Sequence, residues 1–269
     1  MFFLEKITSP ANPAVKRMSL LNSSRSARYD QRRFVTEGLR LCCDAMLSQV
    51  HIEKIYFTSA AYAKHSDEID RLIAYADSAC EISDTVQSRL SETKTPQGVF
   101  GLCEMKSQAF DVEQIVSGGR YIALEGIQDP SNLGAIARTA EALGIDGMVT
   151  FGCCDMYSPK ALRASMGAFF RLPIFTTDDI ICLTQELKSR GVNVLACVPD
   201  REACDIRGLD FSRPSLAVVG NEGNGISEEL KNACSMQITV PMMGRAESLN
   251  ASHAATLVMW EMMRGRYGE

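Results

Sequence analysis

The sequence lacks the features that mark membrane-spanning and secreted proteins. No stretch approaches the roughly 20 apolar residues that a membrane-spanning helix needs. The start, MFFLEKITSP, has its lone basic residue after a very short apolar run rather than before a long one, so a secretory signal is not expected. The 269 residues, 46% hydrophobic and 23% charged, predict a folded cytoplasmic protein with room for two ordinary domains.

Histidine is scarce, and cysteine follows no metal-binding pattern. The sequence contains no C-x-x-C, and its three histidines, His51, His65 and His253, have no ligand-like spacing. Ten cysteines are too few for a disulfide scaffold in a chain of this length. We therefore expect reduced, mostly buried thiols and no metal ion.

The chain is acidic overall, but its first 40 residues are basic. They hold eight Lys or Arg and three Asp or Glu side chains, a net charge of +5, whereas the whole chain has −5 and the other 229 residues therefore have −10. A basic arm on an acidic body can follow a phosphate backbone while the protein stays soluble. The alternative is an ordinary solvated helix face.

Residues 1–105 predict a small α/β domain, because helical patterns and strand-like runs alternate in it. The helices are expected at Asn12–Asn22, at Arg33–Val50 after Phe34-Val35, at Ile69–Ala76 and at Thr85–Leu90, and the strands at Ile52–Thr58 and Gly98–Cys103. The regular pattern then stops, and residues 106–119 are expected to link this domain to a second one over residues 120–269.

The second half predicts a mainly parallel β-sheet with helices on both faces, because short β-rich runs alternate with helical patterns. The strands are expected at Tyr121–Leu124, Gly147–Phe151, Val192–Val198, Leu216–Gly220 and Met236–Val240. The helices are expected at Leu133–Leu143, Lys160–Phe169, Ile180–Ser189, Ser227–Cys234 and Leu249–Arg264. Ligands of such sheets bind at the carboxyl ends of the strands, so the loops after strands are the candidate sites.

The first of three polar loops follows the strand that ends at Leu124. Pro130 ends any helix before it, and Ser131 or Asn132 is expected to cap the next helix. Arg138 is expected on the next turn after Gly134, on the same face of that helix. Taken alone, the loop also fits an ordinary capped helix with a surface arginine.

The second and third loops follow the strands at Leu216–Gly220 and Met236–Val240. The segment Gly220–Gly225 surrounds Glu222 with three glycines, which suits a ligand held by backbone groups. It is neither a dinucleotide fingerprint nor a P-loop, and its acid repels phosphates, so the expected ligand is neutral or cationic. In the third loop Ser248 is expected to cap the long last helix, with Asn250 in its first turn.

Together the loops resemble the three motifs of the SpoU, or TrmH-like, branch of the SPOUT RNA methyltransferases. The matching segments are Asn132–Ala140, Gly220–Gly225, and Val240-Pro241-Met242 with Ser248–Ser252. The likeness covers about 150 residues, from residue 120 on. Upstream, Phe34–Gly38 and Thr95–Gly98 resemble more loosely the substrate-binding domain that often precedes this module and is related to RNA-binding ribosomal proteins.

The resemblance implies a trefoil knot that binds S-adenosylmethionine, a homodimer through the knot region, and methylation of a ribose 2′-hydroxyl in ribosomal or transfer RNA. By position, backbone atoms of three residues would hold the cofactor: Gly220, Val240 and Leu249. The reaction site would contain Asn132, Arg138, Glu222, Ser248 and Asn250. Basic residues of the N-terminal arm would contact RNA: Lys16, Arg17, Arg25, Arg28, Arg32 and Arg33.

The role of Arg138 depends on its chemistry. Proposals for the family make this arginine the base that takes the hydroxyl proton, but a guanidinium with a pKa above about 12 is rarely deprotonated. We expect Arg138 chiefly to clamp the phosphate beside the target ribose, and Glu222 either to hold Arg138 or to accept a hydrogen bond. Ala251 stands where valine is usual, and we expect His253 to be a packed or interface residue rather than a base.

Two other functions fit parts of the sequence. One is an RNA-binding protein that keeps the fold without catalysis, and the other is a nucleotide-using metabolic enzyme, suggested by the loop at Gly220. The presence of every polar motif residue favours the methyltransferase. The sequence leaves open which RNA and which nucleotide are modified.

Overall fold

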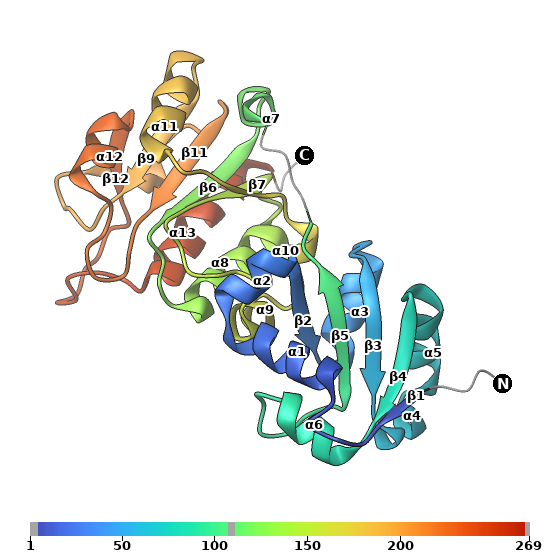
Figure 1. The fold of residues 1–269 in the computed structure, drawn as a ribbon. Coiled ribbons are helices and arrows are strands. Elements are labelled where there is room, and N and C mark those ends of the chain that lie inside the picture. Colours follow the sequence, from blue (N-terminus) through green and yellow to red (C-terminus); the bar gives the residue numbers. More distant parts are fainter. Residues whose placement is uncertain (1–4, 107–110, 267–269) are drawn as a thin grey trace. The chain divides into compact units, whose positions relative to one another are not determined.

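The chain forms two units, each built around one β-sheet (Figure 1). The computed structural model describes residues 5–106 and 111–266. The N-terminal unit contains residues 5–106 and the later segment 155–170, and the C-terminal unit contains residues 111–154 and 171–266. The chain therefore passes between the units three times.

The N-terminal unit has a mixed sheet. Its strands, in spatial order, are β1 (Glu5–Ile7), β4 (Ser78–Ile82), β3 (Ile52–Phe57), β5 (Val99–Glu104) and β2 (Arg33–Glu37). β5 is antiparallel to both β3 and β2, whereas β4 is parallel to both β1 and β3. The predicted strands β3 and β5 are confirmed, and together they form the middle of this sheet.

Helices cover both faces of the N-terminal sheet. On one face α1 (Pro13–Ser23) and α6 (Asp84–Leu90) pack with Val35 of β2 and Leu102 of β5 in one apolar cluster. The neighbouring strand residues Thr36 and Cys103 point the other way, and the Thr36 hydroxyl lies 3.2 Å from the Cys42 thiol of α3 (Leu39–Leu47). Residues 5–106 also form α2 (Arg25–Gln31), α4 (Ser59–Lys64) and α5 (Ser66–Tyr75).

The helix expected at Arg33–Val50 begins only at Leu39. Residues Arg33–Glu37 form β2 because Phe34, Val35 and Thr36 favour a buried extended strand. Gly38, at φ 101°, then separates the strand from α3. The prediction was wrong for the first turn because helical spacing alone did not reveal this short strand.

The helix expected at Lys160–Phe169 is two helices that belong to the N-terminal unit. α9 (Pro159–Ser165) ends because Met166 and Gly167 are left-handed, at φ 48° and 82°, and α10 (Ala168–Arg171) follows. The segment 155–170 packs on Phe34 of β2 through aromatic rings. The Phe34 ring centroid lies 4.8 Å from that of Tyr157 and 5.8 Å from that of Phe170.

The C-terminal unit has a seven-stranded sheet whose described pairs are all parallel, which confirms the predicted α/β class. The spatial order is β10 (Cys204–Asp205), β12 (Met236–Thr239), β9 (Asn193–Cys197), β11 (Ser215–Val219), β6 (Arg120–Glu125), β7 (Gly147–Phe151) and β8 (Ile174–Thr176). All five predicted strands are present. The sequence did not predict β8 and β10, which are too short to show a period.

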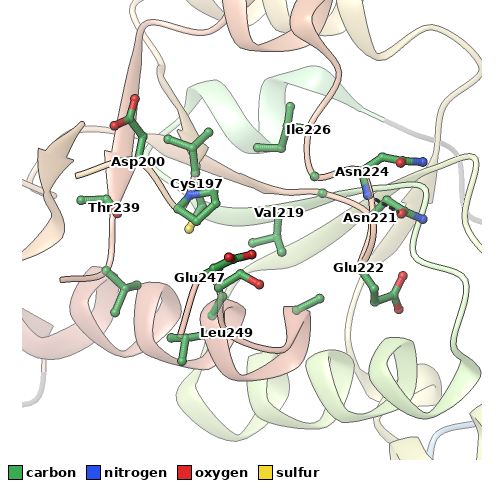
Figure 2. A pocket seen from close by; sticks show the side chains of 18 of the residues that line it. Cys197, Asp200, Val219, Asn221, Glu222, Asn224, Ile226, Thr239, Glu247 and Leu249 are labelled. Carbon is green, nitrogen blue, oxygen red and sulfur yellow. Dashed lines mark hydrogen bonds between the residues drawn. The ribbon is translucent and has the colours of Figure 1, made fainter. Parts of the chain in front are cut away.

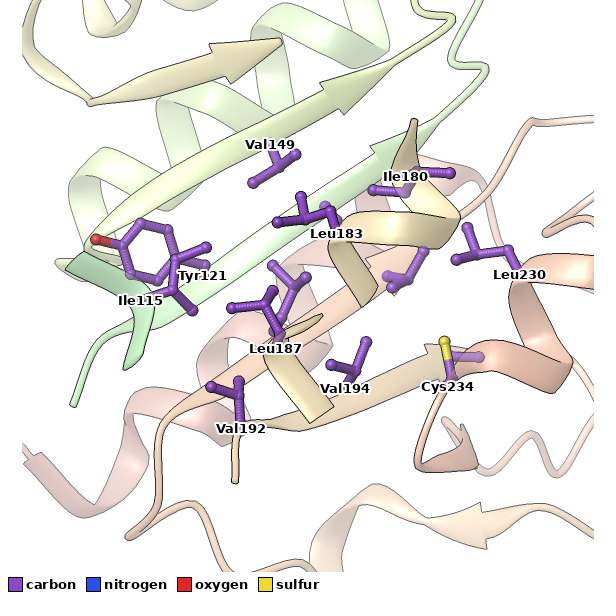
Figure 3. Packing of buried hydrophobic residues seen from close by; sticks show 14 of the residues in the cluster. Ile115, Tyr121, Val149, Ile180, Leu183, Leu187, Val192, Val194, Leu230 and Cys234 are labelled. Atoms are coloured by element: carbon purple, nitrogen blue, oxygen red, sulfur yellow. The ribbon is translucent and has the colours of Figure 1, made fainter. Parts of the chain in front are cut away.

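Helices lie on both faces of this sheet, as predicted. α8 (Pro130–Leu143) and α13 (Ala251–Met263) pack against each other on one face. On the other face lie α7 (Val112–Val116), α11 (Ile180–Ser189) and α12 (Glu228–Ala233). There Leu187 and Leu230 are fully buried against strand residues (Figure 3), and each contributes about 2 kcal/mol of hydrophobic free energy.

Two helix starts differ from the prediction. Asp129, and neither Ser131 nor Asn132, caps α8, because Pro130 is already the first helical residue and the Asp129 side chain accepts from the Ser131 N–H at 2.9 Å. Asn250, and not Ser248, caps α13 by accepting from the Ser252 N–H at 2.9 Å. The observed caps therefore lie two to three residues from the expected ones.

The connections create a switch point between β6 and β11. From β6 the chain passes through α8 to β7 on one side, whereas from β11 it passes through α12 to β12 on the other side. The loops that follow these adjacent strands therefore diverge, and open α/β sheets bind their ligands at such points. The three motif loops follow β6, β11 and β12.

Candidate active site and cofactor cavity

Side-chain hydrogen bonds join the loops that follow β6 and β11. Glu125, the last residue of β6, accepts from the backbone N–H and the hydroxyl of Ser227 at 2.8 and 2.7 Å. Asn221 donates its side-chain amide to the carbonyl oxygen of Gly126 at 2.7 Å. These bonds hold the two loops together at the carboxyl edge of the sheet.

The glycine-rich loop after β11 is a tight turn. Asn221 and Gly225 exchange two backbone hydrogen bonds of 3.0 and 2.9 Å, and the Asn221 side chain accepts from the N–H of Gly223 and of Asn224 at 2.8 and 3.0 Å. A Cβ at Gly220 would lie 2.2 Å from the carbonyl carbon of Gly225, so only glycine fits there. Glu222 therefore projects from a well-defined turn.

Glu222 accepts three hydrogen bonds from the start of α8. Its Oε1 accepts from the N–H of Asp129 at 3.2 Å and from Asn132 Nδ2 at 2.9 Å, and its Oε2 accepts from the N–H of Gln128 at 3.2 Å. Desolvation raises the pKa of Glu222, but the hydrogen bonds outweigh it and the net effect lowers the pKa of this carboxyl. A carboxylate with a lowered pKa is a poor proton acceptor and a good anchor.

A directed chain of hydrogen bonds joins Glu222 to the start of α13. Asn132 donates to Glu222, and its Oδ1 accepts from Asn250 Nδ2 at 3.1 Å. The Oδ1 of Asn250 in turn accepts from the N–H and the hydroxyl of Ser252 at 2.9 and 2.7 Å. Because a carboxylate can only accept, it sets the orientation of both amides.

Arg138 and Ser248 stand apart from this chain. Both side chains are exposed, and neither forms a hydrogen bond or an ion pair within residues 5–106 and 111–266. Glu222 was expected either to hold Arg138 or to accept a hydrogen bond. Within the described residues it accepts hydrogen bonds and does not pair with Arg138. Arg138 and Ser248 remain available to a ligand.

A cavity of about 500 Å³ opens where β9, β11 and β12 end (Figure 2). The three residues expected to hold a cofactor, Gly220, Val240 and Leu249, all line it. Part of its wall is the Cys197 thiol, whose pKa is raised to about 11 by burial, so this wall is neutral. The charged residues of the lining are three acids and one base, Asp200, Glu222, Glu247 and Lys231, which favours a cationic ligand.

The six basic residues expected to contact RNA differ in availability. Arg28 is 4% exposed, its guanidinium lies 2.6 Å from the Asp155 carboxylate, and it also donates to the carbonyl oxygens of Leu21 and Asn22. Arg28 therefore fixes the end of α1 and cannot reach a phosphate without breaking a buried ion pair.

Two more of the six are bound to the same acid. Arg17 and Arg33 lie 2.8 and 3.0 Å from the Glu53 carboxylate, and both are partly buried. The hydrogen bonds to these arginines outweigh desolvation, the largest single effect, and lower the pKa of Glu53. The side chains that stay exposed are Lys16, Arg25 and Arg32.

All ten cysteines lie in the described part and are free thiols. Within that part, no group of three or more His, Cys, Asp or Glu side chains is arranged to hold a metal ion. Its helices also include none with the length and apolarity that crossing a membrane requires.

Comparisons with known proteins match both halves of the chain. Residues 119–260 match the SpoU rRNA Methylase family, and residues 12–101 match the MRM3-like substrate binding domain. The chain is 30% identical to an uncharacterized tRNA/rRNA methyltransferase of Synechocystis sp., over 98% of this chain and 95% of the relative. It is 28% identical to the 23S rRNA (guanosine(2553)-2′-O)-methyltransferase of Bacillus subtilis, over 96% of this chain and 99% of the relative.

A solved structure is similar over both units. It is the AdoMet-bound rRNA methyltransferase from Sinorhizobium meliloti, with 30% sequence identity and a TM-score of 0.84. The match covers 97% of this chain and 98% of that chain.

Proposed function

We propose that this chain, which belongs to the SpoU rRNA Methylase family and is an S-adenosylmethionine-dependent RNA 2′-O-methyltransferase, methylates a ribose of ribosomal RNA in the cytoplasm. The relative named for 23S rRNA matches the chain over 96% of its length, and thus over the N-terminal unit as well as the catalytic one. A catalytically silent protein is not favoured, because every polar motif residue is present. The nucleotide-using metabolic enzyme is disfavoured by the family match.

The cavity beside Gly220, Val240 and Leu249 fits S-adenosylmethionine in size and charge. Its volume of about 500 Å³ is in the range of small-molecule sites, and its acids suit a ligand that carries a positive sulfur. When bound, S-adenosylmethionine supplies an electrophilic methyl group. We assign the backbone atoms of these three residues to its binding.

Our assignment of the reaction site depends on which motif side chains form hydrogen bonds within the protein and which do not. Asn132, Glu222 and Asn250 are hydrogen-bonded to one another, so we assign them the task of holding the site in shape and orienting the ribose hydroxyl. Arg138 and Ser248 are exposed, so we assign the phosphate beside the ribose to Arg138 and the hydroxyl itself to Ser248. Positioning then supplies most of the rate, since the lowered pKa of Glu222 makes it a poor base.

We assign RNA binding to the N-terminal domain, over residues 1–105, joined by residues 106–119 to the methyltransferase domain at 120–269. Lys16, Arg25 and Arg32 are its proposed phosphate contacts because they are exposed. We leave out Arg28, which is buried against Asp155, and give Arg17 and Arg33 a smaller part because both are already paired with Glu53.

A homodimer through α13 is part of the proposal. His253, Leu257 and Trp260 are exposed on one face of this helix at the spacing i, i+4, i+7, and the exposed fractions of Leu257 and Trp260 are 41% and 48%. A second copy of the chain would cover this stripe, with His253 in the interface.

The trefoil knot is proposed for the same region. The chain leaves β12, next to the edge strand, and residues 240–250 lead back to α13, which packs on α8 and contacts β6 and β11 in the middle of the sheet. Residues 240–250, which contain the third motif loop, would thus pass the turn at Gly220–Gly225. We propose that the chain threads through the knot at this point.

Mapping of ribose methylation tests the function. Ribosomal and transfer RNA from cells with and without the gene would be compared, with complementation by the wild-type chain and by the Arg138→Ala variant. We expect one ribosomal site to lose its methyl group and to regain it only with the wild type. A lost site in transfer RNA would refute the ribosomal assignment, and no lost site in either RNA would refute the housekeeping role.

A further inference from the structure

One carboxylate in the cavity is left unbonded by the chain itself. Of the three acids in the lining, Glu222 accepts three hydrogen bonds from the start of α8, and Asp200 accepts from the N–H of Glu202 at 2.9 Å. Glu247 has neither a hydrogen bond nor an ion pair with any residue that the structure describes. Figure 2 shows its carboxylate directed into the cavity, whereas those of Asp200 and Glu222 point away from it.

Glu247 also stands at the junction of the two proposed binding regions. It directly precedes Ser248, which we assign to the ribose hydroxyl, and lies two residues before Leu249, which we assign to the cofactor. Lys231, the base of the lining, is paired with Glu228 and does not neutralise Glu247. An unpaired negative charge in the cavity lining therefore lies next to the residues that we assign to the cofactor and to the ribose hydroxyl.

We propose that Glu247 is the counter-charge of the cofactor sulfonium and makes the enzyme prefer S-adenosylmethionine over its product, S-adenosylhomocysteine. The inference rests on the proposed function of this cavity. The two ligands share the adenosine and amino-acid parts and differ by one methyl group and one positive charge. An acid near the sulfur attracts the first ligand and not the second, which favours exchange of product for fresh cofactor.

The test compares the affinities of both ligands for the full-length wild type, Glu247→Gln and Asp200→Asn by titration calorimetry. Asp200→Asn removes the same charge from the same cavity and is the matched control. We expect Glu247→Gln to lower the preference for S-adenosylmethionine over S-adenosylhomocysteine about tenfold, and Asp200→Asn to change it by less than about twofold. Thermal melting of each variant shows that it is folded.

Three results would overturn the inference. An unchanged preference in Glu247→Gln means that the carboxylate does not face the sulfur. Equal weakening of both ligands means that it binds the ammonium group that they share. A matching loss in Asp200→Asn means that only the overall charge matters. If the wild type binds neither ligand, the proposed function fails as well, so the two failures are distinguishable.

Discussion

Asn132 Nδ2 lies 2.9 Å from the Glu222 carboxylate, and this one contact decides which atoms of the site donate and which accept. Since the carboxylate accepts only, Asn132 turns its oxygen toward Asn250, and Asn250 turns its oxygen toward Ser252 at the start of α13. The direction of these hydrogen bonds thus depends on the charge of the Glu222 side chain as well as on its size.

Replacement of Glu222 by Gln keeps the size of the side chain but presents an N–H₂ group to donors. We expect kcat to fall about tenfold to a hundredfold, because an unsatisfied donor costs about 1–3 kcal/mol. Affinity for S-adenosylmethionine should change much less. Single-turnover RNA methylation and calorimetry separate the two effects, with the exposed Glu229→Gln as the matched control. Normal turnover in Glu222→Gln would contradict the anchoring role.

Arg138 should act on RNA and leave the fold unchanged. Because its side chain is exposed, Arg138→Ala should alter the free energy of unfolding by no more than about 0.5 kcal/mol. RNA affinity should fall and the salt dependence of binding should weaken by about one phosphate contact, which fluorescence anisotropy at several salt concentrations would show. Arg138→Lys should also be impaired because lysine cannot make the bidentate contact, and near-normal turnover of that variant would refute the clamp.

Arg28 should behave in the opposite way. The side chains of Arg28 and Asp155 are 5% and 6% exposed, so Arg28→Met leaves the buried Asp155 carboxylate without its counter-charge, although Asp155 still accepts from the N–H of Tyr157 at 2.9 Å. We expect a loss of about 3–5 kcal/mol in the free energy of unfolding, measured by urea titration. Arg25→Met, which removes an exposed charge on the same helix, is the control. Similar stability of both variants would mean that the ion pair contributes nothing.

His51 gives the N-terminal unit a pH-dependent contact. Hydrogen bonds to Glu104 and Asp77, at 3.0 and 2.9 Å, raise the pKa of His51. The folded state therefore favours the protonated His51 ring. The stability that this ring contributes is present below about pH 6.5 and is lost as the pH rises through the pKa of His51 in the folded state. His51→Gln should therefore lower the melting temperature more at pH 5.5 than at pH 8.5, and an equal effect at both pH values would contradict this contribution. Because His51 is exposed, the effect should be small.

The stripe on α13 should control assembly. A charge at Leu257, which is 41% exposed, is tolerated in a monomer but not in a covered interface, so we expect Leu257→Glu to halve the mass measured by light scattering. Leu47→Glu places the same charge on a leucine of the N-terminal unit that is 76% exposed, and it should leave the mass unchanged. A wild-type chain that is already monomeric would refute the dimer.

The sequence predicted those parts of the fold that have a local signal. The segment Gly147–Phe151 is a short β-rich run, and Ile180–Ser189 has a clear helical period, so both were predicted with the observed limits. The motif residues Gly220, Val240 and Leu249, chosen by resemblance, line one cavity.

The other features of the fold and of the site depend on contacts between residues that are far apart in the sequence, and no local sequence pattern predicts such contacts. Glu125 and Ser227 are 102 positions apart, and Arg28 and Asp155 are 127 apart. Arg28 looked like its basic neighbours, and only the fold shows that it is buried. A signal for Glu125 was present, since a carboxylate at the carboxyl end of a buried strand stands at the edge where ligands bind. Nothing in the sequence indicated that Ser227 would be its partner.

The inclusion of residues 155–170 in the N-terminal unit has a consequence for synthesis on the ribosome. When residue 106 has emerged, Phe34 still lacks the Tyr157 and Phe170 rings, and Arg28 still lacks Asp155. The first unit thus cannot finish folding until β6, α8 and β7 of the second have also been made. Nascent chains arrested shortly after residue 106 should therefore be protease-sensitive, and resistance of the first unit should appear only after residue 170 is exposed.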